Sequence, residues 1–254
     1  MISTMFTKSL LTATVVATLV LQLFLTLPAN AQCPCEEALP ALQSLYNATD
    51  GPHWINPWQN LFSGASVCDL SGINCTSNGN IWIELRNRNL VGTIPDDFAV
   101  RYPRVSMFAV AFNNLRGTLP STLALFGEHI GVFDVSRNGL GGTLPAEFSN
   151  WTSVGNFWVQ NCSFKGTLPL EYASWGNSLK TFYFYSNALS GTIPPEYSAW
   201  SSIVVFSGSN NNINGTIPRV VISAWKDTIY DFSMSQNGFL TGDLFGSDGN
   251  GFCE

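Results

Sequence analysis

Apolar residues recur along this chain in pairs separated by one position, and the pairs repeat roughly every 25 residues. Such alternation is typical of a short strand with one buried face. An asparagine usually follows, three positions after the second apolar residue, where an inward amide can satisfy backbone groups that strand pairing leaves open. The pairs are Ile83/Leu85, Phe108/Val110, Phe133/Val135, Phe157/Val159, Phe182/Phe184, Phe206/Gly208 and Phe232/Met234. The asparagines are Asn113, Asn138, Asn187, Asn211 and Asn237, with Arg88 and Cys162 in the same place of units one and four.

The phrase Gly-Thr-Ile/Leu-Pro follows each of these segments. Its glycines are spaced by 25, 25, 24, 25 and 24 residues, at Gly92, Gly117, Gly142, Gly166, Gly191 and Gly215. A decayed seventh copy ends at Gly242-Asp243-Leu244. A period of this length indicates stacked structural units that share one continuous core. The chain is therefore predicted to be an α/β solenoid of about seven units of 24–25 residues.

After each proline, large apolar residues return with a spacing of three, which suits a 3₁₀ turn or a short helix. They are Phe98, Leu123/Phe126, Phe148/Trp151, Tyr172/Trp175 and Tyr197/Trp200, with Trp225 one residue late. We expect these rings to close the core on the side opposite the strands. The phenylalanine file from Phe108 to Phe232 is expected to stack inside the solenoid, since neighbouring strands place rings at a favourable distance. The alternative is an aromatic slot for a ligand.

These repeats resemble the leucine-rich repeat consensus in its plant-type variant, with its trailing G-x-I-P, over roughly residues 80–245. Segments such as Pro145-Ala146-Glu147-Phe148-Ser149 also resemble the P-x-E-W-S segments of trypanosomatid surface antigens. Phenylalanine stands where both families commonly have leucine. The resemblance implies a parallel β-sheet on the concave face and a convex face of 3₁₀, short helical and irregular segments.

Together with the features of the leader, the resemblance gives a domain plan: a signal peptide at 1–31, an N-terminal cap at 32–79, repeats at 80–245 and a short C-terminal end at 246–254. The cap resembles that of the same class in its stretch Ala41–Asn47 and in Trp54, Trp58, Cys68 and Cys75. By this likeness Cys68 and Cys75 form a disulfide. We expect a helix over Glu36–Tyr46 within the cap.

The leader has the features of a secretory signal. Lys8 precedes a nearly continuous apolar run from Leu10 to Leu27, and Ala29-Asn30-Ala31 supplies a small-residue cleavage site before Gln32. An uncleaved anchor is the alternative. We therefore expect the protein to be secreted or to lie on the extracellular face of the cell surface.

The charge balance limits the classes of partner. The chain carries 11 basic and 17 acidic residues, a net charge of −6, and no basic run. Nucleic acid is therefore not an expected partner. The expected partner is an extracellular protein or glycan.

The remaining cysteines leave several pairings open. A bridge between Cys33 and Cys35 would be strained, so one of them is expected to pair within the cap. Cys162 occupies the asparagine column and is expected to be a buried, reduced core residue. Cys253 has no local partner and is expected to be unbridged or to link two molecules into a disulfide-bonded oligomer.

Five N-glycosylation sequons suit an exported chain. We expect glycans at two or three of Asn47, Asn74, Asn150 and Asn214, the alternative being chance in a repeat rich in Asn, Ser and Thr. The fifth sequon, at Asn161, is expected to be poorly occupied because its neighbour Cys162 points inward.

No catalytic constellation is apparent. His53 and His129 each lack a sequence neighbour that would suggest a metal site or a triad, and the acidic residues are scattered. The glycines belong to repeat turns and have no phosphate-binding form. We expect a non-enzymatic protein with no metal and no small-molecule cofactor.

The outward strand positions of the concave face carry the candidate site. Trp158, Tyr183 and Tyr185 cluster in units four and five, flanked by Asp134 and Arg137. Exposed aromatic rings beside charges have the composition of a protein-binding hot spot and can also stack on a sugar ring. The sequence therefore predicts ligand recognition there. The alternatives are a structural coat glycoprotein, an inhibitor of a foreign polysaccharide-degrading enzyme, or aromatic rings that are merely exposed.

Overall fold

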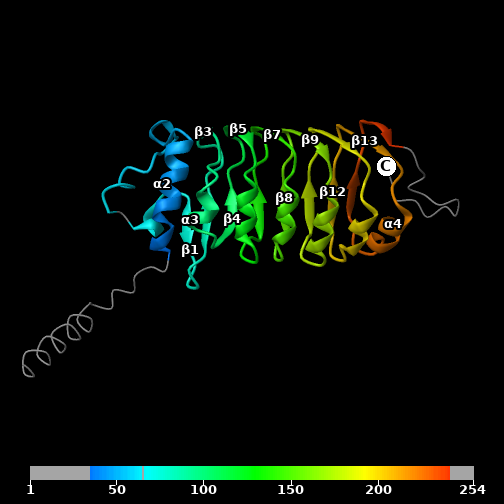
Figure 1. Cartoon of the computed structure of the whole chain (residues 1–254), viewed down its shortest axis with the longest axis horizontal. Helices are drawn as coiled ribbons and strands as arrows, with labels where there is room; N and C mark the ends of the chain where they lie inside the picture. Colours follow the sequence, from blue (N-terminus) through cyan, green and yellow to red (C-terminus); the bar gives the residue numbers. More distant parts are fainter. Residues whose placement is uncertain (1–34, 65, 241–254) are drawn as a thin grey trace, which may run out of the picture. The chain divides into compact units, whose positions relative to one another are not determined.

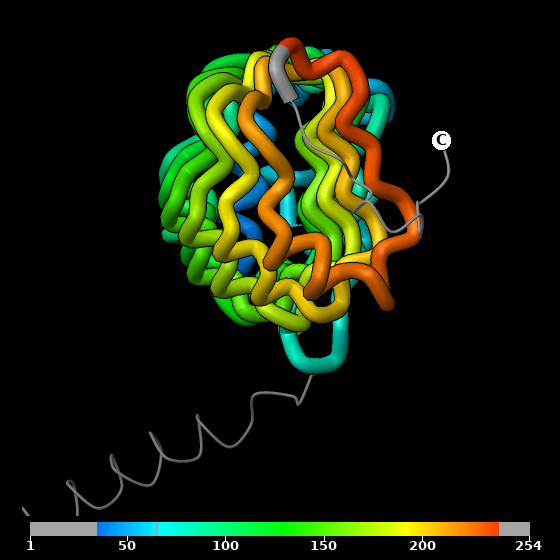
Figure 2. The backbone as a smooth tube through the Cα atoms, turned by 90° about the vertical axis from the view of Figure 1, so that its right-hand side faces the viewer, coloured from blue at the N-terminus to red at the C-terminus, as the bar shows by residue number. Residues whose placement is uncertain are grey.

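The computed structural model describes residues 35–64 and 66–240. Successive repeats lie side by side along one axis (Figure 1), and a view along that axis shows their turns nearly superposed (Figure 2). The repeat interpretation is therefore confirmed. The predicted signal peptide, the C-terminal end at 246–254, Cys33 and Cys253 all lie outside the described residues.

The apolar pairs form one face of an eight-stranded sheet ordered β1-β2-β4-β6-β8-β10-β12-β14. Its strands are β1 (Ile73–Cys75), β2 (Ile81–Glu84), β4 (Val105–Ala109), β6 (Val132–Asp134), β8 (Asn156–Trp158), β10 (Thr181–Tyr183), β12 (Val205–Ser207) and β14 (Asp231–Ser233). Strand β1 comes from the cap and runs antiparallel to β2, whereas the seven repeat strands are parallel. Pairing sets each phenylalanine of the file directly opposite the next, as in Phe157↔Phe182.

The Gly-Thr segments form a second sheet, ordered β15-β13-β11-β9-β7-β5-β3. Its strands are β3 (Val91–Gly92), β5 (Asn114–Thr118), β7 (Gly139–Gly142), β9 (Ser163–Thr167), β11 (Ala188–Gly191), β13 (Asn211–Gly215) and β15 (Asn237–Leu240). The sequence pattern suggested a tight turn here, because glycine-rich strands lack the usual β propensity. This part of the backbone is therefore more regular than expected.

Glycine is required in this second sheet for two reasons. Gly142 has φ 78°, in the left-handed region that favours glycine. A Cβ placed on it would also lie 2.7 Å from Cγ2 of Thr118 in the preceding repeat. Gly166, Gly191 and Gly215 repeat both features, each against the threonine one repeat earlier. The threonine methyl thus packs over the next glycine, which explains why the two residues recur together.

Short helical segments close the opposite side of the core, as the spacing of three predicts. They are α3 (Phe98–Arg101), η4 (Ser121–Phe126), η5 (Ala146–Asn150), η6 (Leu170–Trp175), η7 (Pro195–Ala199) and α4 (Arg219–Trp225), where η denotes a 3₁₀ helix. Their aromatic rings point inward. Phe148, Tyr172 and Tyr197 are fully buried, as are the tryptophans of the neighbouring repeats.

Two aromatic files run through the core. Neighbouring rings of the phenylalanine file lie 5.3 to 5.8 Å apart from Phe108 to Phe232, within the favourable range for ring pairs. All are fully buried except Phe232, which is partly buried in the last described repeat. The spine assignment is therefore confirmed. The second file consists of Trp151, Trp175, Trp200 and Trp225, stacked with centroids 6.4, 6.3 and 5.8 Å apart.

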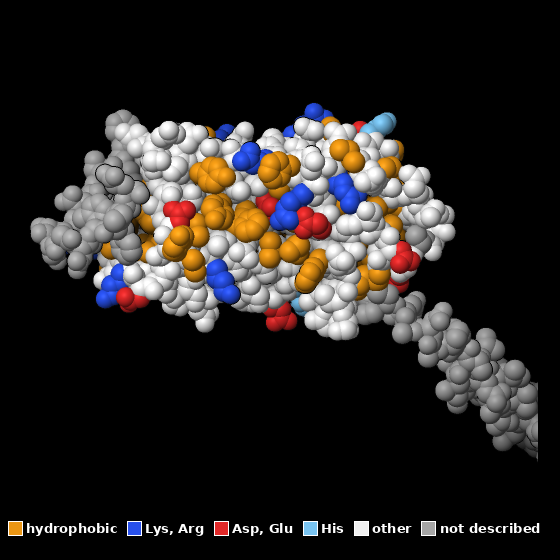
Figure 3. Space-filling model, turned by 180° about the vertical axis from the view of Figure 1, so that it is seen from behind, with side chains coloured by type: hydrophobic (Ala, Val, Ile, Leu, Met, Phe, Trp, Pro, Cys, Tyr) orange, Lys and Arg blue, Asp and Glu red, His pale blue; other side chains and the backbone are white. Residues whose placement is uncertain are grey.

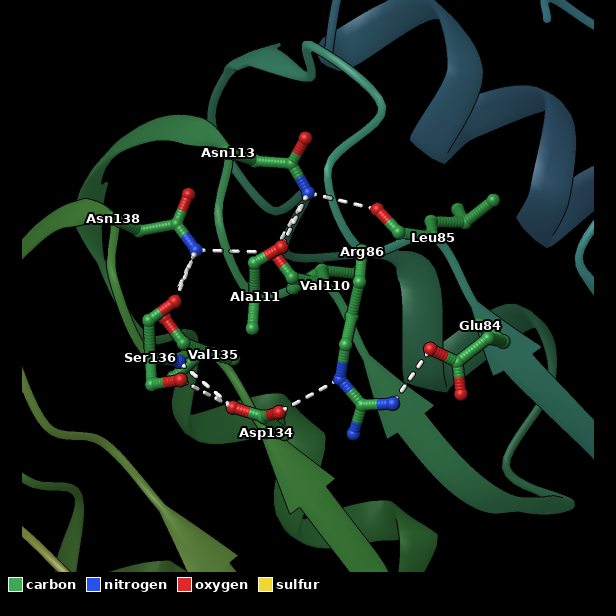
Figure 4. Close-up of polar contacts among 10 residues, drawn as sticks. All are labelled: Glu84, Leu85, Arg86, Val110, Ala111, Asn113, Asp134, Val135, Ser136 and Asn138. Carbon is green, nitrogen blue, oxygen red and sulfur yellow. Dashed lines mark hydrogen bonds and ion pairs between the residues drawn. The ribbon is translucent and has the colours of Figure 1, made fainter. Parts of the chain in front are cut away.

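The asparagine column bonds the loops between repeats. The amide of Asn138 donates to the carbonyls of Val110 and Val135 (Figure 4). Its oxygen accepts from the backbone N–H of Leu115. Each asparagine of the column thus satisfies backbone groups in its own repeat and in the preceding one. Cys162 takes this place in one repeat with its thiol near the carbonyl of Val135. It is reduced but only partly buried, which corrects the expectation of full burial.

The cap covers the edge of the first repeat. It contains η1 (Glu36–Ala38), α2 (Leu39–Ala48), η2 (Gly51–His53), η3 (Val67–Asp69) and β1. The predicted helix is thus a 3₁₀ turn followed by an α-helix. Tyr46, Trp54 and Trp58 pack together with centroids 4.9 to 5.8 Å apart. The disulfide Cys68–Cys75 is present and joins η3 to β1.

Candidate functional site

The outward residues of the eight-stranded sheet form the predicted concave face, called the sheet face below. Its character changes along the stack. The first repeats carry Glu84 and Arg86, and the middle repeats carry aromatic rings. The last repeats carry the serines Ser207, Ser209, Ser233 and Ser235. Figure 3 shows hydrophobic side chains gathered around a small central group of basic and acidic side chains.

Trp158, Tyr183 and Tyr185 form a contiguous aromatic cluster on this face. Trp158 and Tyr183 are paired in register on β8 and β10, with ring centroids 6.0 Å apart and planes at 70°. Tyr183 and Tyr185 are 6.3 Å apart at 88°. All three are half-buried, so each ring keeps an open surface. The structure thus brings together the three aromatic residues that the sequence predicts.

Polar contacts fix the largest ring of the aromatic cluster. The indole N–H of Trp158 donates to Oγ1 of Thr181 over 2.8 Å, and that hydroxyl donates to Oδ1 of Asn156. A ring held in this way loses little rotamer freedom when a partner covers it. Burial, together with the charge of Asp231, raises the pKa of Tyr183. Its phenol therefore remains neutral at physiological pH.

Asp134 has a different role from the one predicted. Only 3% of its surface is exposed, and Nε of Arg86 donates to Oδ2 over 3.0 Å. Its other oxygen accepts from the hydroxyl and backbone N–H of Ser136, and Arg86 also bonds Glu84 (Figure 4). Both carboxylate oxygens of Asp134 are therefore hydrogen-bonded below the surface, and the carboxylate positions the half-buried guanidinium of Arg86. The expectation of direct ligand contact by Asp134 does not hold, because alternation of strand positions cannot reveal that larger neighbours cover a side chain.

Arg137 is exposed but turns toward the start of the stack. Its guanidinium lies 4.9 Å from the ring centroid of Phe112, a cation–π arrangement. Both residues occupy the left-handed backbone position before the asparagine, with φ 53° and 58°. Arg137 therefore forms a second exposed pair at the edge of the sheet face. Phe112 is 53% exposed. Phe112 directly precedes Asn113 and Arg137 directly precedes Asn138, and this shared place in the repeat is the sequence signal that could have revealed the pair.

A buried acceptor lies next to the aromatic cluster. Gln160 shares the outward column with Tyr185, and its Oε1 has no hydrogen-bond partner among the described residues. The same is true of Nδ2 of Asn161, the nitrogen to which an N-linked glycan would attach. This burial supports the prediction that the Asn161 sequon is poorly occupied. Asn47, Asn74 and Asn150 are exposed and Asn214 is half-exposed, so all four stay predicted glycan sites.

Metal-ligating side chains gather at one place only within residues 35–64 and 66–240. This group is Cys35, Cys68 and Cys75, and it lies in the cap rather than on the sheet face. The two histidines do not belong to it. No helix among the described residues is both long enough and apolar enough to cross a lipid bilayer.

The comparisons with known proteins identify the fold. No family model and no curated protein matches the chain. Among solved structures, Pollen Receptor Kinase 3 is 19% identical over 85% of this chain and 99% of that one, with a TM-score of 0.70. The BIR2 ectodomain of Arabidopsis thaliana is 22% identical over 84% and 98%, with a TM-score of 0.56. The plant peptide hormone receptor RGFR1, in complex with RGF2, is 26% identical over 57% of this chain but only 23% of its own, with a TM-score of 0.54.

A plant ice-binding protein is also similar, at 16% identity and a TM-score of 0.60, covering 79% of this chain and 71% of its own. The same fold thus carries unrelated functions, so function has to be argued from the surface. None of these structures is a trypanosomatid protein, and that likeness stays a prediction. The parallel strands, asparagine column and 3₁₀ segments together with these neighbours show that the chain has the leucine-rich repeat fold of plant receptor ectodomains.

Proposed function

We propose that this protein is an exported, non-enzymatic recognition protein that binds an extracellular protein or glycan on the sheet face. The observation that supports this most strongly is the aromatic cluster. Trp158, Tyr183 and Tyr185 are half-buried, contact one another edge to face and are not part of the hydrophobic core. By contrast, the tryptophans at 54, 58, 151, 175, 200 and 225 are buried. Large exposed rings of this kind are typical anchors of binding interfaces.

The side chains on either side of the aromatic cluster are more buried than its rings, which suits a partner that packs against the rings. On one side lie Asp134 and Ser136, which are 3% and 2% exposed, and on the other lies Ser207, 7% exposed. The half-buried rings are therefore flanked by buried side chains on both sides. Neither tyrosine hydroxyl bonds another described residue, so both are available to polar groups of a ligand. A flat sugar ring or a protein side chain would satisfy this arrangement.

Partners of related folds agree with a recognition role without fixing the ligand. The structure of the plant peptide hormone receptor RGFR1 is a complex with RGF2, and that of PEPR1 is one with AtPEP1. The predicted export of this chain and its predicted sequons support a site that lies outside the cell. Surface adhesion, coat formation and inhibition of a foreign hydrolase remain distinct outcomes of the test below.

The test compares binding by the mature chain with binding by two matched double variants. Glycan arrays and panels of extracellular proteins serve as probes. Trp158→Ala/Tyr183→Ala removes two anchors of the cluster, and Trp82→Ala/Tyr230→Ala removes exposed rings outside it, which are 45% and 89% exposed. We expect the first variant to lose binding about thirtyfold, as for a hot spot of about 2 kcal/mol, and the second to keep it. Equal binding by the cluster variant, with both variants folded, would place the site elsewhere.

A further inference from the structure

The cap holds a third sulfur against its disulfide. The Sγ atoms of Cys35, Cys68 and Cys75 all lie within 4.8 Å of one another, and Cys68 and Cys75 are bonded. The thiol of Cys35 is fully buried, whereas Cys75 is only half-buried. A thiol packed against a disulfide is the arrangement from which thiol–disulfide exchange proceeds.

Contacts from the next residue keep Cys35 in this position. The carboxylate of Glu36 accepts from the hydroxyl of Ser66 and from the backbone N–H of Val67. Ser66 caps η3, whose second residue is Cys68. The 3₁₀ turn that begins after Cys35 is therefore bonded to the turn that carries Cys68, so the two sulfurs are held close by the fold.

We propose that the cap disulfide can move from Cys68–Cys75 to Cys35–Cys68. The thiolate of Cys35, having given its proton to water, attacks Sγ of Cys68 and forms a new S–S bond. The Cys68–Cys75 bond breaks, and Cys75 leaves as a thiolate that takes a proton from water. One disulfide replaces another, so no oxidant is consumed. The exchange transfers the thiol from a buried position to a half-buried one.

The transferred thiol makes Cys75 a modification site for small disulfides. Its thiolate would attack glutathione disulfide, form a mixed disulfide and release one glutathione thiolate. In the starting state, the sulfur of Cys75 is bonded and Cys35 is shielded, so neither reacts. The cap therefore reacts with small disulfides only after the internal exchange.

The surroundings of Cys35 set when exchange can occur. Burial raises the pKa of its thiol, as does the charge of Glu36, while Arg104, the Tyr102 hydroxyl and the backbone at Thr76 act in the opposite direction. Only the thiolate attacks a disulfide, so exchange is slow near neutral pH and faster in alkali. Tyr102, whose pKa is raised to about 12, stays protonated throughout that range.

Peptide mapping tests the proposal directly. The mature chain carrying Cys33→Ser is incubated in its folded state near pH 7 and near pH 9, then alkylated with N-ethylmaleimide in acid. Proteases that cut after Glu36 and before Asp69 place the three cysteines on separate peptides. We expect a peptide pair joined through Cys35 and Cys68, with maleimide on Cys75, in an amount that rises with pH. If Cys68–Cys75 is the only bridge at both pH values, the proposal is wrong.

A matched variant separates internal exchange from direct attack on the bridge. In Cys35→Ser, glutathione disulfide should add no mass to Cys75, whereas the parent chain should gain one glutathione there. Cys35→Ala provides the same comparison if serine disturbs the buried site, and thermal unfolding checks that each variant is folded. Equal glutathionylation of Cys75 with and without Cys35 would overturn the proposal.

Discussion

Trp175 and Trp200 stack with ring centroids 6.3 Å apart and planes 13° from parallel. Each indole N–H donates over 2.9 Å to a carbonyl of the preceding repeat, Phe148 for Trp175 and Tyr172 for Trp200. Each of these tryptophans thus donates a hydrogen bond to the main chain of the preceding repeat and stacks on the tryptophan of that preceding repeat. This relationship explains why a tryptophan recurs six residues after the proline at Trp151, Trp175 and Trp200.

The phenylalanine file should carry much of the stability. Phe157 is fully buried between Phe133 and Phe182, so Phe157→Ala should lower the free energy of unfolding by about 3–5 kcal/mol. Urea unfolding measures the loss. Leu125→Ala, at a 53% exposed position, is the control and should change little. Comparable losses in the two variants would contradict the buried assignment.

The asparagine column should be equally sensitive. Asn138→Ala removes three hydrogen bonds, two to buried carbonyls and one from a backbone N–H, which should cost about 2–4 kcal/mol. Cys162→Asn should keep or raise the stability, because an amide at this place can make the bonds seen in the other repeats. Chemical unfolding of both variants checks the pair. A neutral Asn138→Ala, or a strongly destabilising Cys162→Asn, would show that the column is not the main bond between loops.

Much of this architecture follows from the sequence, for a physical reason. Each repeat faces an almost identical neighbour, so a buried position such as Phe157 is buried in every copy and the period alone predicts it. The second sheet was missed because its strands are short and glycine-rich. Asp134 was misplaced because its burial depends on the particular side chains of Arg86 and Ser136, which a period does not specify. That the three aromatic rings lie together could be expected from the sequence, since every second residue of a strand shares one face and the repeat period sets Trp158 and Tyr183 side by side.

Stability should fall in alkali through two buried phenols. Burial raises the pKa of Tyr172 and Tyr197 well above the ordinary value, and their hydroxyls donate to the carbonyls of Pro145 and Pro169. In the unfolded chain these phenols lose their protons from about pH 10, while the folded chain keeps them. The unfolded state is then favoured by about 1.4 kcal/mol per pH unit for each tyrosine.

Denaturant unfolding between about pH 9 and pH 11 measures this slope. Tyr172→Phe/Tyr197→Phe should flatten it, although the variant is less stable near neutral pH because two carbonyls lose a donor. Tyr230→Phe is the control, since that residue is 89% exposed. A slope unchanged in the double variant would mean that these phenols do not govern the alkaline loss.

The packing of threonine over glycine can be measured with a double-mutant cycle. Gly142→Ala should destabilise by about 1–3 kcal/mol, since alanine must adopt φ 78° and its Cβ would meet the methyl of Thr118. Adding Thr118→Ser removes that methyl and should recover part of the loss, the backbone strain remaining. Purely additive effects would show that the methyl is not in the way.

The most direct test of the proposed recognition site uses the fluorescence of Trp158. The other seven tryptophans include six buried ones and Trp82, so in Trp82→Phe the emission that acrylamide can quench comes mainly from Trp158. A protein or glycan retained from the binding panels is added at saturation, and the quenching constant is compared with and without it. The account predicts that the ligand shields Trp158 and lowers the quenching constant severalfold. Quenching that is unchanged by a saturating ligand would contradict recognition at this cluster.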